Sequence, residues 1–552
     1  MKAKYILTAL LAMGFMAQSC QDELDIEKKG NLGSPETYYT TDAEVQAGLA
    51  MCYSVMNRWW GYQLYDILDN LSDDMYTGGG TSTDYNDKQL LNAYCFSSDN
   101  PEIKGCYQNL YTIIYNANLI LHYVPLNNTT ITPVMKQCMS EAYFFRGLCY
   151  MYLGAMWGTA PIVTDIMAPS ECTVPNAESQ NAVYEQAISD FKAAISEGGL
   201  VTKKDKNAVE YRITTELAQA YMGKTQVFAG KWSEAASSLA AVISSNKYDL
   251  AANEDYENLL NNRSNGNPEI MFSRYCDPTS TNPQSDWNAP QGANCYYEEH
   301  VMRGWRNDLW DWNVSPAWPP SIIGLDGMMA GYGECNPRAS LYNDMKAWEE
   351  KNGGDLSRLN QTMKTYEWVS GTGNVISAGR KLFGNEGYFF WKNRFLSEEI
   401  LGCYGFGGWN VWLNSNFRYM RYSEVLLLAA EAYLQSGNVA AATAELNKVR
   451  ERAHETALGA CTMDDIKNEK RFELCIEACR WIDIVRWGDA PALLANQGKS
   501  VPQFDGSKTD VGATHANGGF VKGKHELLPF PATEMLVNPN IVQNPGWGGA
   551  AE

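Results

Sequence analysis

Three segments of the chain repeat one spacing of small and large apolar residues, and this repeat constrains the fold more than any other feature. An alanine is followed four positions later by a large apolar residue, and three positions after that by a smaller one, in residues 187–194, 235–242 and 442–449. These positions share one face of a helix. In two segments a glycine, Gly230 or Gly437, stands five residues before the alanine. The pattern predicts antiparallel helical pairs that approach closely at their small residues.

This spacing is that of a tetratricopeptide unit, whose helical pairs stack on their neighbours. Other segments also have helical periodicity, and helices are predicted at 42–59, 101–124, 133–157, 181–195, 212–228, 232–245, 418–435, 440–453 and 463–487. We therefore predict a mainly α fold: a tetratricopeptide-like helical-pair scaffold with a loop-rich ligand-binding part. The helical regions are expected at 42–260 and 417–552, the second completing the scaffold.

Between residues 261 and 416 the composition changes to glycine, asparagine, proline and tryptophan, and helical periodicity mostly fades. So long an irregular stretch inside a compact protein usually carries function or a small fold of its own. We expect the ligand to bind in this region.

The first residues resemble a secretory signal. Lys2 and Lys4 precede a short apolar run, and Ala17-Gln18-Ser19-Cys20 looks like a bacterial lipobox, in which the cysteine is acylated and becomes the first mature residue. We predict a signal peptide at 1–19, lipidation of Cys20 and a linker at 20–41. Several acyl chains would hold the protein on a membrane without a spanning helix. The alternative is a cleaved signal with an incidental Cys20.

The chain is acidic, with a net charge of −20 that becomes −22 once Lys2 and Lys4 are removed with the signal. Such a surface repels nucleic acid, so we expect no nucleic-acid partner and favour a neutral ligand. Without Cys20, thirteen cysteines remain, an odd number that cannot pair completely. No Cys-x-x-Cys or His-Glu-x-x-His motif occurs, and there are only five histidines. We therefore expect no zinc site and no cofactor.

Several segments together resemble the SusD/RagB family of outer-membrane nutrient-binding lipoproteins. Glu469–Leu474 with Arg480–Gly488 looks like the family's "ERRxELAFExxRWFDLxRWG" segment, and Arg418–Leu427 is similar to its "RYAEVLLxxAEA" helix. Further matching segments are 141–161, 430–450, 528–531 and 538–546. Residues 261–417 match no family motif. Within the matched helix, Glu477 with Arg480 and Asp483 with Arg486 are spaced to pair along one face, which indicates a structural role.

The resemblance implies four tetratricopeptide-like units and a loop-rich part that carries the ligand site. It also implies docking as a lid on a SusC-like TonB-dependent transporter barrel. The predicted location is the outer membrane, lipid-anchored and facing the cell exterior. The expected function is capture of an oligosaccharide or polysaccharide and its delivery to that transporter, without catalysis.

Aromatic rings match the C–H faces of sugars, and tryptophan and tyrosine add a polar group. Five of the seventeen tryptophans fall between positions 287 and 318, accompanied by tyrosines. We take the ligand-binding candidates to be Trp287, Tyr296, Trp305, Trp310 and Trp312. Neighbouring polar residues could hydrogen-bond hydroxyl groups, among them Arg303, Arg306 and Asp308. The alternative is that these rings pack the loop region against the helical core.

A second candidate is Tyr76 with Tyr85, which flank Gly78-Gly79-Gly80. This glycine run lacks the Lys-Ser/Thr ending of a phosphate-binding loop. Trp59 and Trp60 come third.

Three other functions compete with glycan capture. A peptide-binding lid would favour backbone-pairing amides and apolar pockets over an aromatic platform. A purely structural lid would have no ligand. A glycoside hydrolase needs two carboxylates across a cleft, which 64 acidic residues neither support nor exclude. The resemblance, and no single residue, favours a protein that is not an enzyme.

Overall fold

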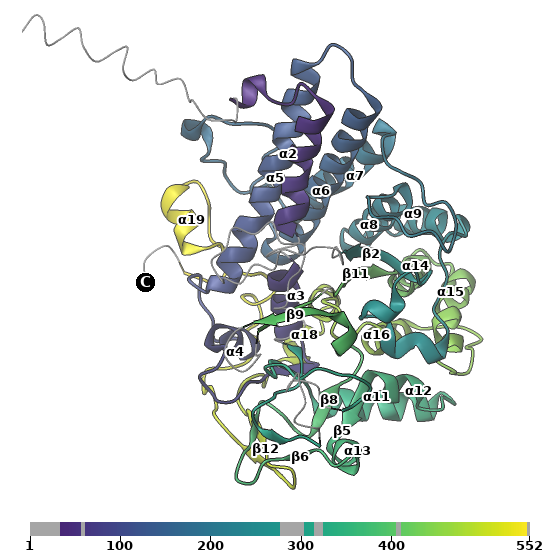
Figure 1. Cartoon of the computed structure of the whole chain (residues 1–552). Helices are drawn as coiled ribbons and strands as arrows, with labels where there is room; N and C mark the ends of the chain where they lie inside the picture. Colours follow the sequence, from purple (N-terminus) through teal and green to yellow (C-terminus); the bar gives the residue numbers. More distant parts are fainter. Residues whose placement is uncertain are drawn as a thin grey trace, which may run out of the picture.

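Helices dominate the computed structural model, which describes residues 34–56, 61–275, 303–313, 324–404, 410–413 and 415–548 (Figure 1). The predicted mainly α fold is confirmed. Figure 1 shows long helices at the top, shorter helical pairs at the right and a part rich in loops and short strands at the bottom.

Four helices form the upper layer: α2 (Asp42–Val55), α5 (Pro101–Asn127), α6 (Pro133–Trp157) and α7 (Gln180–Glu197). Their starts follow from local chemistry. Thr41 and Glu44 form a capping box at α2, where the Glu44 amide donates to Thr41 Oγ1 over 3.3 Å. Asn100 and Thr132 cap α5 and α6, each before a proline that needs no helical hydrogen-bond donor.

The predicted repeat helices pair as expected. They are α8 (Thr215–Phe228) with α9 (Trp232–Ser244), and α14 (Tyr422–Gln435) with α15 (Val439–Arg452). Gly230 and Gly437 adopt φ of +68° and +87° at the turns, a conformation that favours glycine. A Cβ on Gly223 of α8 would lie 2.7 Å from Leu239 Cγ of α9, so a small residue permits this close approach.

The predicted helix at 463–487 is wrong, because two helices, α16 (Met463–Glu473) and α17 (Arg480–Arg486), replace it. Between them Ala478 has φ +57°, and its amide donates to Asp69 Oδ1 over 2.9 Å. Arg480 pairs with Asp73 (Nε–Oδ1 2.7 Å) rather than along its own helix. The predicted Asp483–Arg486 pair is present at 2.9 Å.

The remaining helices are short, apart from α11 in the region predicted to be rich in loops. They are α3 (Gly61–Asn70), α4 (Asn86–Asn92), α11 (Ala339–Lys351), α12 (Ser357–Thr362), α13 (Tyr366–Gly371), α18 (Ala490–Leu493) and α19 (Ala532–Val537). Sequence periodicity missed α11, whose apolar stripe is narrow: its buried residues are Leu341, Met345 and the charged Glu349.

The strands form small antiparallel sheets, which join segments far apart in the chain. The pairs are β1 (Met75–Thr77) with β4 (Cys335–Pro337), β2 (Ile270–Arg274) with β11 (Phe417–Arg421), β3 (Trp310–Asp311) with β6 (Val375–Ile376), β5 (Met363–Thr365) with β8 (Tyr388–Phe390) and β9 (Ile400–Tyr404) with β10 (Asn410–Leu413). A three-stranded sheet has the order β13 (Thr509–Val511), β12 (Pro502–Phe504), β7 (Leu382–Phe383).

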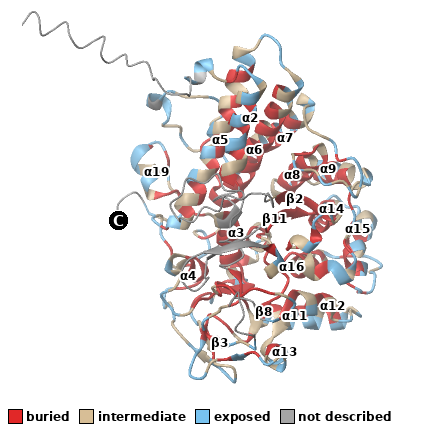
Figure 2. Cartoon of the chain, in the orientation of Figure 1, coloured by how far each residue is buried: buried red, intermediate tan, exposed pale blue. Residues whose placement is uncertain are grey.

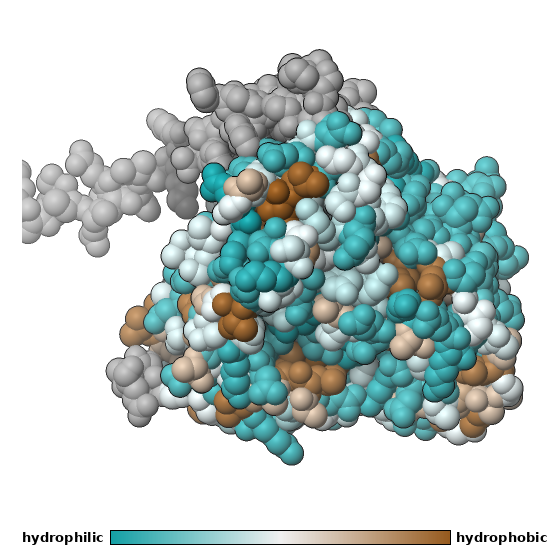
Figure 3. Space-filling view, turned by 90° about the horizontal axis from the view of Figure 1, so that it is seen from below, coloured by the Kyte–Doolittle hydropathy of each residue, from teal (hydrophilic) through white to brown (hydrophobic). Residues whose placement is uncertain are grey.

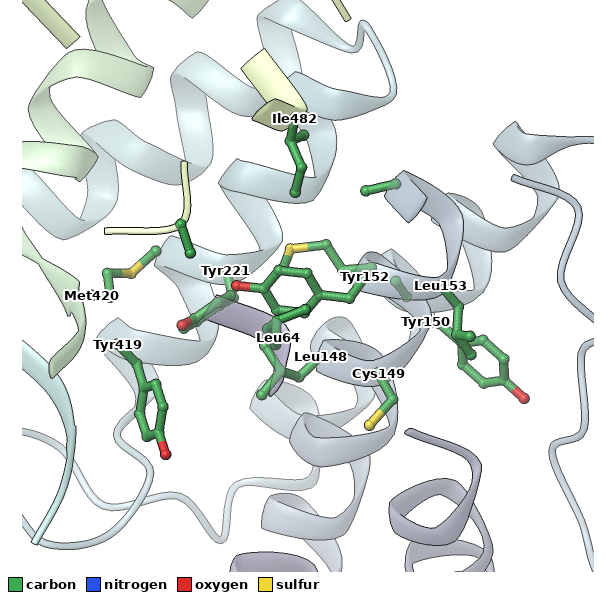
Figure 4. Packing of buried hydrophobic residues seen from close by; sticks show 14 of the residues in the cluster. Leu64, Leu148, Cys149, Tyr150, Tyr152, Leu153, Tyr221, Tyr419, Met420 and Ile482 are labelled. Carbon is green, nitrogen blue, oxygen red and sulfur yellow. The ribbon is translucent and has the colours of Figure 1, made fainter. Parts of the chain in front are cut away.

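The largest core runs through the helical layers, where buried residues line the inner helix faces (Figure 2). Figure 4 shows Tyr152 among Leu64, Leu148 and Tyr221, which come from different helices. A second apolar cluster around Trp305 fills the loop-rich part. None of the described helices combines the length and apolar character needed to cross a bilayer.

Buried ion pairs connect the helical scaffold to the loop-rich part. Arg358 of α12 bonds Glu455 (Nη2–Oε1 2.6 Å) and Glu469, and all three side chains are fully buried. Lys392 similarly bonds Glu477 over 2.5 Å. Further members of this network are Glu269, Arg421, Arg450, Arg452 and Glu473. We call it the arginine–glutamate network. Removing one partner of such a pair typically costs about 3–5 kcal/mol.

Candidate ligand-binding surface

Five of the predicted ligand-binding residues lie in the described part of the chain: Tyr76, Tyr85, Trp305, Trp310 and Trp312. Others singled out in the sequence lie outside the described residues, namely Trp287, Tyr296, the third candidate pair Trp59 and Trp60, and the lipidation candidate Cys20.

Trp305 is a core residue, which corrects its prediction as a ligand platform. Its side chain is 4% exposed and its indole Nε1–H donates to the Phe390 carbonyl over 2.7 Å. Its ring lies 4.9 Å from that of Phe389. Arg303, predicted to bond sugar hydroxyls, is also buried and pairs with Asp69 over 2.7 Å. The packing alternative holds for this part of the segment.

Trp310 and Trp312 form a stack that runs from the core to the surface. Residues two apart in a strand share a face, and these rings lie 4.8 Å apart with planes 14° from parallel. Trp310 is 5% exposed, and its ring also packs against Phe389 at 5.3 Å and Tyr366 at 5.9 Å. Trp312 is half-buried, and its Nε1–H donates to the Asn307 carbonyl over 3.0 Å. Burial removes Trp310 from the predicted contacts and leaves Trp312 as the outer ring.

Tyr76 is also inaccessible as a platform. It is 9% exposed, and the guanidinium carbon of Arg338 lies 3.8 Å from its ring centroid. Burial raises the pKa of the Tyr76 hydroxyl. Tyr85, at the start of α4, is half-buried and adopts φ +50°. Of this pair, only Tyr85 presents ring surface to solvent.

The glycine run at 78–80 serves close packing. A Cβ on Gly78 would lie 2.1 Å from Asn336 Nδ2 and 2.3 Å from the Gly333 carbonyl oxygen, so no side chain fits there. Gly79 has φ +119°, and a Cβ on Gly80 would lie 2.7 Å from an Arg306 nitrogen. The glycines let the loop 77–85 lie flat on the segments around 306 and 334.

Arg306 brings the two candidate sites together. Its guanidinium bonds Asp308 through Nε (2.5 Å) and Nη2 (3.1 Å), and Nη1 reaches Asp84 Oδ2 at 3.2 Å. Partial burial alone would lower the pKa of Arg306. The ion pairs with Asp308 and Asp84 outweigh this effect, so the pKa of Arg306 is raised. Asp84 also accepts from the Gly80 amide at 2.7 Å. Two stretches more than 200 positions apart therefore form one surface.

We call this the Arg306 surface and define it by its accessible residues. They are Thr81, Ser82, Thr83, Asp84, Tyr85, Arg306, Asp308 and Trp312. It offers two aromatic rings, four hydroxyl groups and two carboxylates, both paired with the guanidinium of Arg306. Such a set suits a neutral ligand with many hydroxyl groups. Within the described part of the chain, no group of histidine, cysteine, aspartate and glutamate side chains is arranged to hold a metal ion.

A cluster of buried charged side chains lies beside the Arg306 surface. Lys88 of α4 bonds Asp66 (2.5 Å) and Glu334 (2.6 Å), and all three side chains are at most 6% exposed. Burial, with the neighbouring Asp66, raises the pKa of Glu334 to about 8. The Gly78 amide donates to the Glu334 carbonyl over 2.6 Å. The cluster therefore fixes both ends of the loop 77–85.

Sequence reasoning missed one exposed ring in this part of the molecule. Trp368 of α13 is 41% exposed, with Lys364 Nζ 4.7 Å from its ring centroid and the Trp391 ring 5.5 Å away. It lies outside the tryptophan-rich stretch 287–318, so the density of tryptophans in the sequence did not indicate it. Seen from below, hydrophilic side chains dominate the visible surface and hydrophobic ones form separate patches (Figure 3).

Comparison with known proteins agrees with this architecture. The model of the SusD family matches residues 337–547, and a family described as "Starch-binding associating with outer membrane" matches residues 27–226. A SusD-like protein from Formosa agariphila is 24% identical, covering 96% of each chain. One from Bacteroides ovatus is 22% identical, covering 99% of this chain and 98% of its own.

Solved structures show the same fold. A laminarin-binding SusD-like protein superposes with a TM-score of 0.72 at 23% identity, over 91% of this chain and 99% of its own. Surface glycan-binding protein A from Bacteroides thetaiotaomicron in complex with laminarihexaose gives 0.70 at 19% identity, over 92% and 100%. With two family models that between them span more than half of its length, the chain belongs to the SusD family.

Proposed function

We propose that this protein captures oligosaccharide or polysaccharide chains and delivers them to a TonB-dependent outer-membrane transporter of the SusC type. The observation that carries the proposal is the Arg306 surface, in a chain that belongs to the SusD family. Two structural neighbours are described as binding laminarin or laminarihexaose, which makes neutral glucans the first ligands to test.

Within the Arg306 surface, Trp312 and Tyr85 are the proposed platforms for sugar rings. Trp312 is backed by Trp310, so its outer face is held in place before a ligand arrives. Asp308 and Asp84 accept hydrogen bonds from hydroxyl groups while Arg306 balances their charge. Trp287 and Tyr296 remain proposed contacts. The role is binding and transfer, with no bond broken in the glycan.

Delivery requires the protein to sit beside its transporter. We propose lipidation at Cys20, anchoring in the outer membrane and exposure toward the cell exterior. The family description of association with the outer membrane supports this placement.

A binding panel tests the function. The purified chain is titrated calorimetrically with laminarihexaose and with hexasaccharides of maltose, cellulose, xylan and mannan type. Saturable binding of at least one is expected, nearly independent of salt because no ion pair forms with a neutral sugar. The mixtures are then assayed for new reducing ends. Binding of none, or release of reducing ends that one carboxylate substitution abolishes, contradicts the proposal.

A further inference from the structure

A groove of about 680 Å³ lies between α5, the segment 161–174 and α19. Figure 1 shows α19 beside the lower part of α5. The groove shares no lining residue with the Arg306 surface. Two other hollows in the described chain measure only about 20 Å³ each. Sites for small ligands usually fall between about 300 and 1,000 Å³, so this groove has room for one.

Three tyrosines of α5 form one wall. Tyr107, Tyr111 and Tyr115 are spaced four residues apart and therefore share a helix face. The rings of Tyr107 and Tyr111 lie 4.8 Å apart. Tyr107 is buried, Tyr111 half-buried and Tyr115 53% exposed. They make an aromatic strip from the floor of the groove to its rim.

Hydrogen bonds hold the segment 161–174, which lines the groove beside α5. Tyr111 Oη donates to the Pro161 carbonyl over 2.6 Å. Asn118 Nδ2 donates to the Val163 carbonyl over 3.1 Å, and Asn118 Oδ1 accepts from Arg146 Nη1 over 2.8 Å. The segment is therefore tied to both α5 and α6.

Hydrogen bonds also hold the wall formed by α19 and the residues after it. Asn538 Nδ2, just after α19, donates to the Val174 carbonyl over 2.8 Å, and Asn540 Nδ2 donates to the Thr173 carbonyl over 2.6 Å. Since both walls are built from bonded segments, the groove exists before any ligand arrives. Preformed sites lose less entropy on binding.

The polar groups in the groove suit a neutral ligand. Gln108, Asn109 and Thr112 supply amides and a hydroxyl. Glu534 and Asp165 supply carboxyl groups, and that of Asp165 is bonded to His122. Burial raises the pKa of Glu534, and no ion pair to it is present in the described chain. None of the described residues that line the groove is a lysine or an arginine, which disfavours an anionic ligand.

We propose that this groove is a second carbohydrate-binding site, which holds a short neutral stretch of the glycan whose capture is proposed above. Tyr115 and Tyr111 stack on sugar rings, while Glu534 and the amides bond hydroxyl groups. A site apart from the Arg306 surface lets one long chain bind at two points, which strengthens its retention without new contacts at either site. The proposal rests on the proposed function.

Cys172 provides a reporter at the site itself. It lines the groove and is exposed, whereas Cys52, Cys95, Cys106, Cys138, Cys149, Cys335, Cys461, Cys475 and Cys479 are buried or half-buried. Its alkylation by iodoacetamide can be followed peptide by peptide with mass spectrometry. A bound hexasaccharide is expected to slow alkylation of Cys172. The probes are the hexasaccharides of the binding panel, with laminarihexaose first.

Two substitutions complete the test. Tyr115→Ala removes an exposed ring and is expected to weaken the protection of Cys172 on the order of tenfold, as for stacked rings elsewhere. Tyr211→Ala removes a tyrosine that is 69% exposed and does not line the groove, and it should change nothing. Trp312→Ala should leave the protection of Cys172 intact.

The outcomes separate the two proposals. If a hexasaccharide binds but leaves Cys172 alkylation unchanged, and Tyr115→Ala keeps full affinity, the groove is not a glycan site and the proposed function stands. If no hexasaccharide binds at all, the proposed function itself fails. Protection of Cys172 by a mixture of short apolar peptides, with none from any sugar, would make the groove a peptide site and overturn the inference.

Discussion

Truncation of Trp312 and of Trp305 should have opposite effects on binding and folding. Both were predicted as ligand contacts, but the structure makes Trp312 the outer ring of a stack and buries Trp305. If Trp312 stacks on a sugar, Trp312→Ala should cost on the order of 1–3 kcal/mol of binding, by analogy with base–aromatic stacking. This corresponds to a loss of affinity of roughly 5- to 150-fold.

The cost to folding follows from the contacts. Trp312 loses one ring stack, worth about 0.5–1.5 kcal/mol, and one hydrogen bond to Asn307, worth about 1 kcal/mol. Trp305→Ala leaves a cavity in the core, which costs about 3–5 kcal/mol. It also leaves the buried carbonyl of Phe390 without its donor, which costs about 1–3 kcal/mol more. Trp305→Ala should therefore be the more destabilising of the two, at about 4–8 kcal/mol against about 1.5–2.5 kcal/mol for Trp312→Ala.

Urea unfolding and calorimetric titration with the best hexasaccharide measure the two quantities on the same samples. The expected result is weak binding with a small shift of the urea midpoint for Trp312→Ala, and a large shift with binding retained by the folded fraction for Trp305→Ala. Full affinity in Trp312→Ala would remove the platform role of this ring. Lost affinity in Trp305→Ala without lost stability would refute the assignment of that ring to the core.

Three further predictions concern the anchor, the pH and the loop packing. Cys20→Ala should release the protein from membranes, and mass spectrometry of the mature wild-type N-terminus should find an acylated cysteine; an unmodified terminus beyond Cys20 would exclude the anchor. Burial raises the pKa of Glu349 to about 7 and those of Glu334 and Glu455 to about 8, from 4.5. The folded state therefore holds protons that the unfolded state releases, and stability should fall as pH rises from about 5 to about 8; a urea midpoint that rises over this range would contradict the shifts. Gly78→Ala should destabilise the loop 77–85, because a Cβ would meet Asn336 and Gly333, whereas Gly371→Ala, with open space around it, should be neutral or stabilising; equal urea midpoints for both variants would contradict this packing.

The helical scaffold was predictable because its determinants are local. A capping residue, a helical stripe and a turn glycine lie within one segment, and the pairs α8–α9 and α14–α15 follow from them. The break between α16 and α17 was not predictable in this way. It depends on Asp69, which is 409 positions away and accepts from the Ala478 amide.

The candidate site was only partly predictable, because burial there depends on distant partners. The density of tryptophans identified the segment, yet Trp310 is covered through the pairing of β3 with β6, some 65 positions on. Arg303 was predicted to bond sugar hydroxyls, but it is buried and forms an ion pair with Asp69. The spacing of Tyr107, Tyr111 and Tyr115 is visible in the sequence, but the opposite wall comes from residues near 173 and 538.

The arginine–glutamate network limits which positions of this protein can change during evolution. Its members come from the start, the middle and the end of the loop-rich part and from the segments that follow it, so a charge lost from any one of them leaves another buried without its partner. The network therefore holds the loop-rich part at a few fixed points. Between those points, accessible positions such as Trp312 can change residue type without disturbing these ion pairs. A chain built this way can acquire a new ligand specificity while it keeps the same frame.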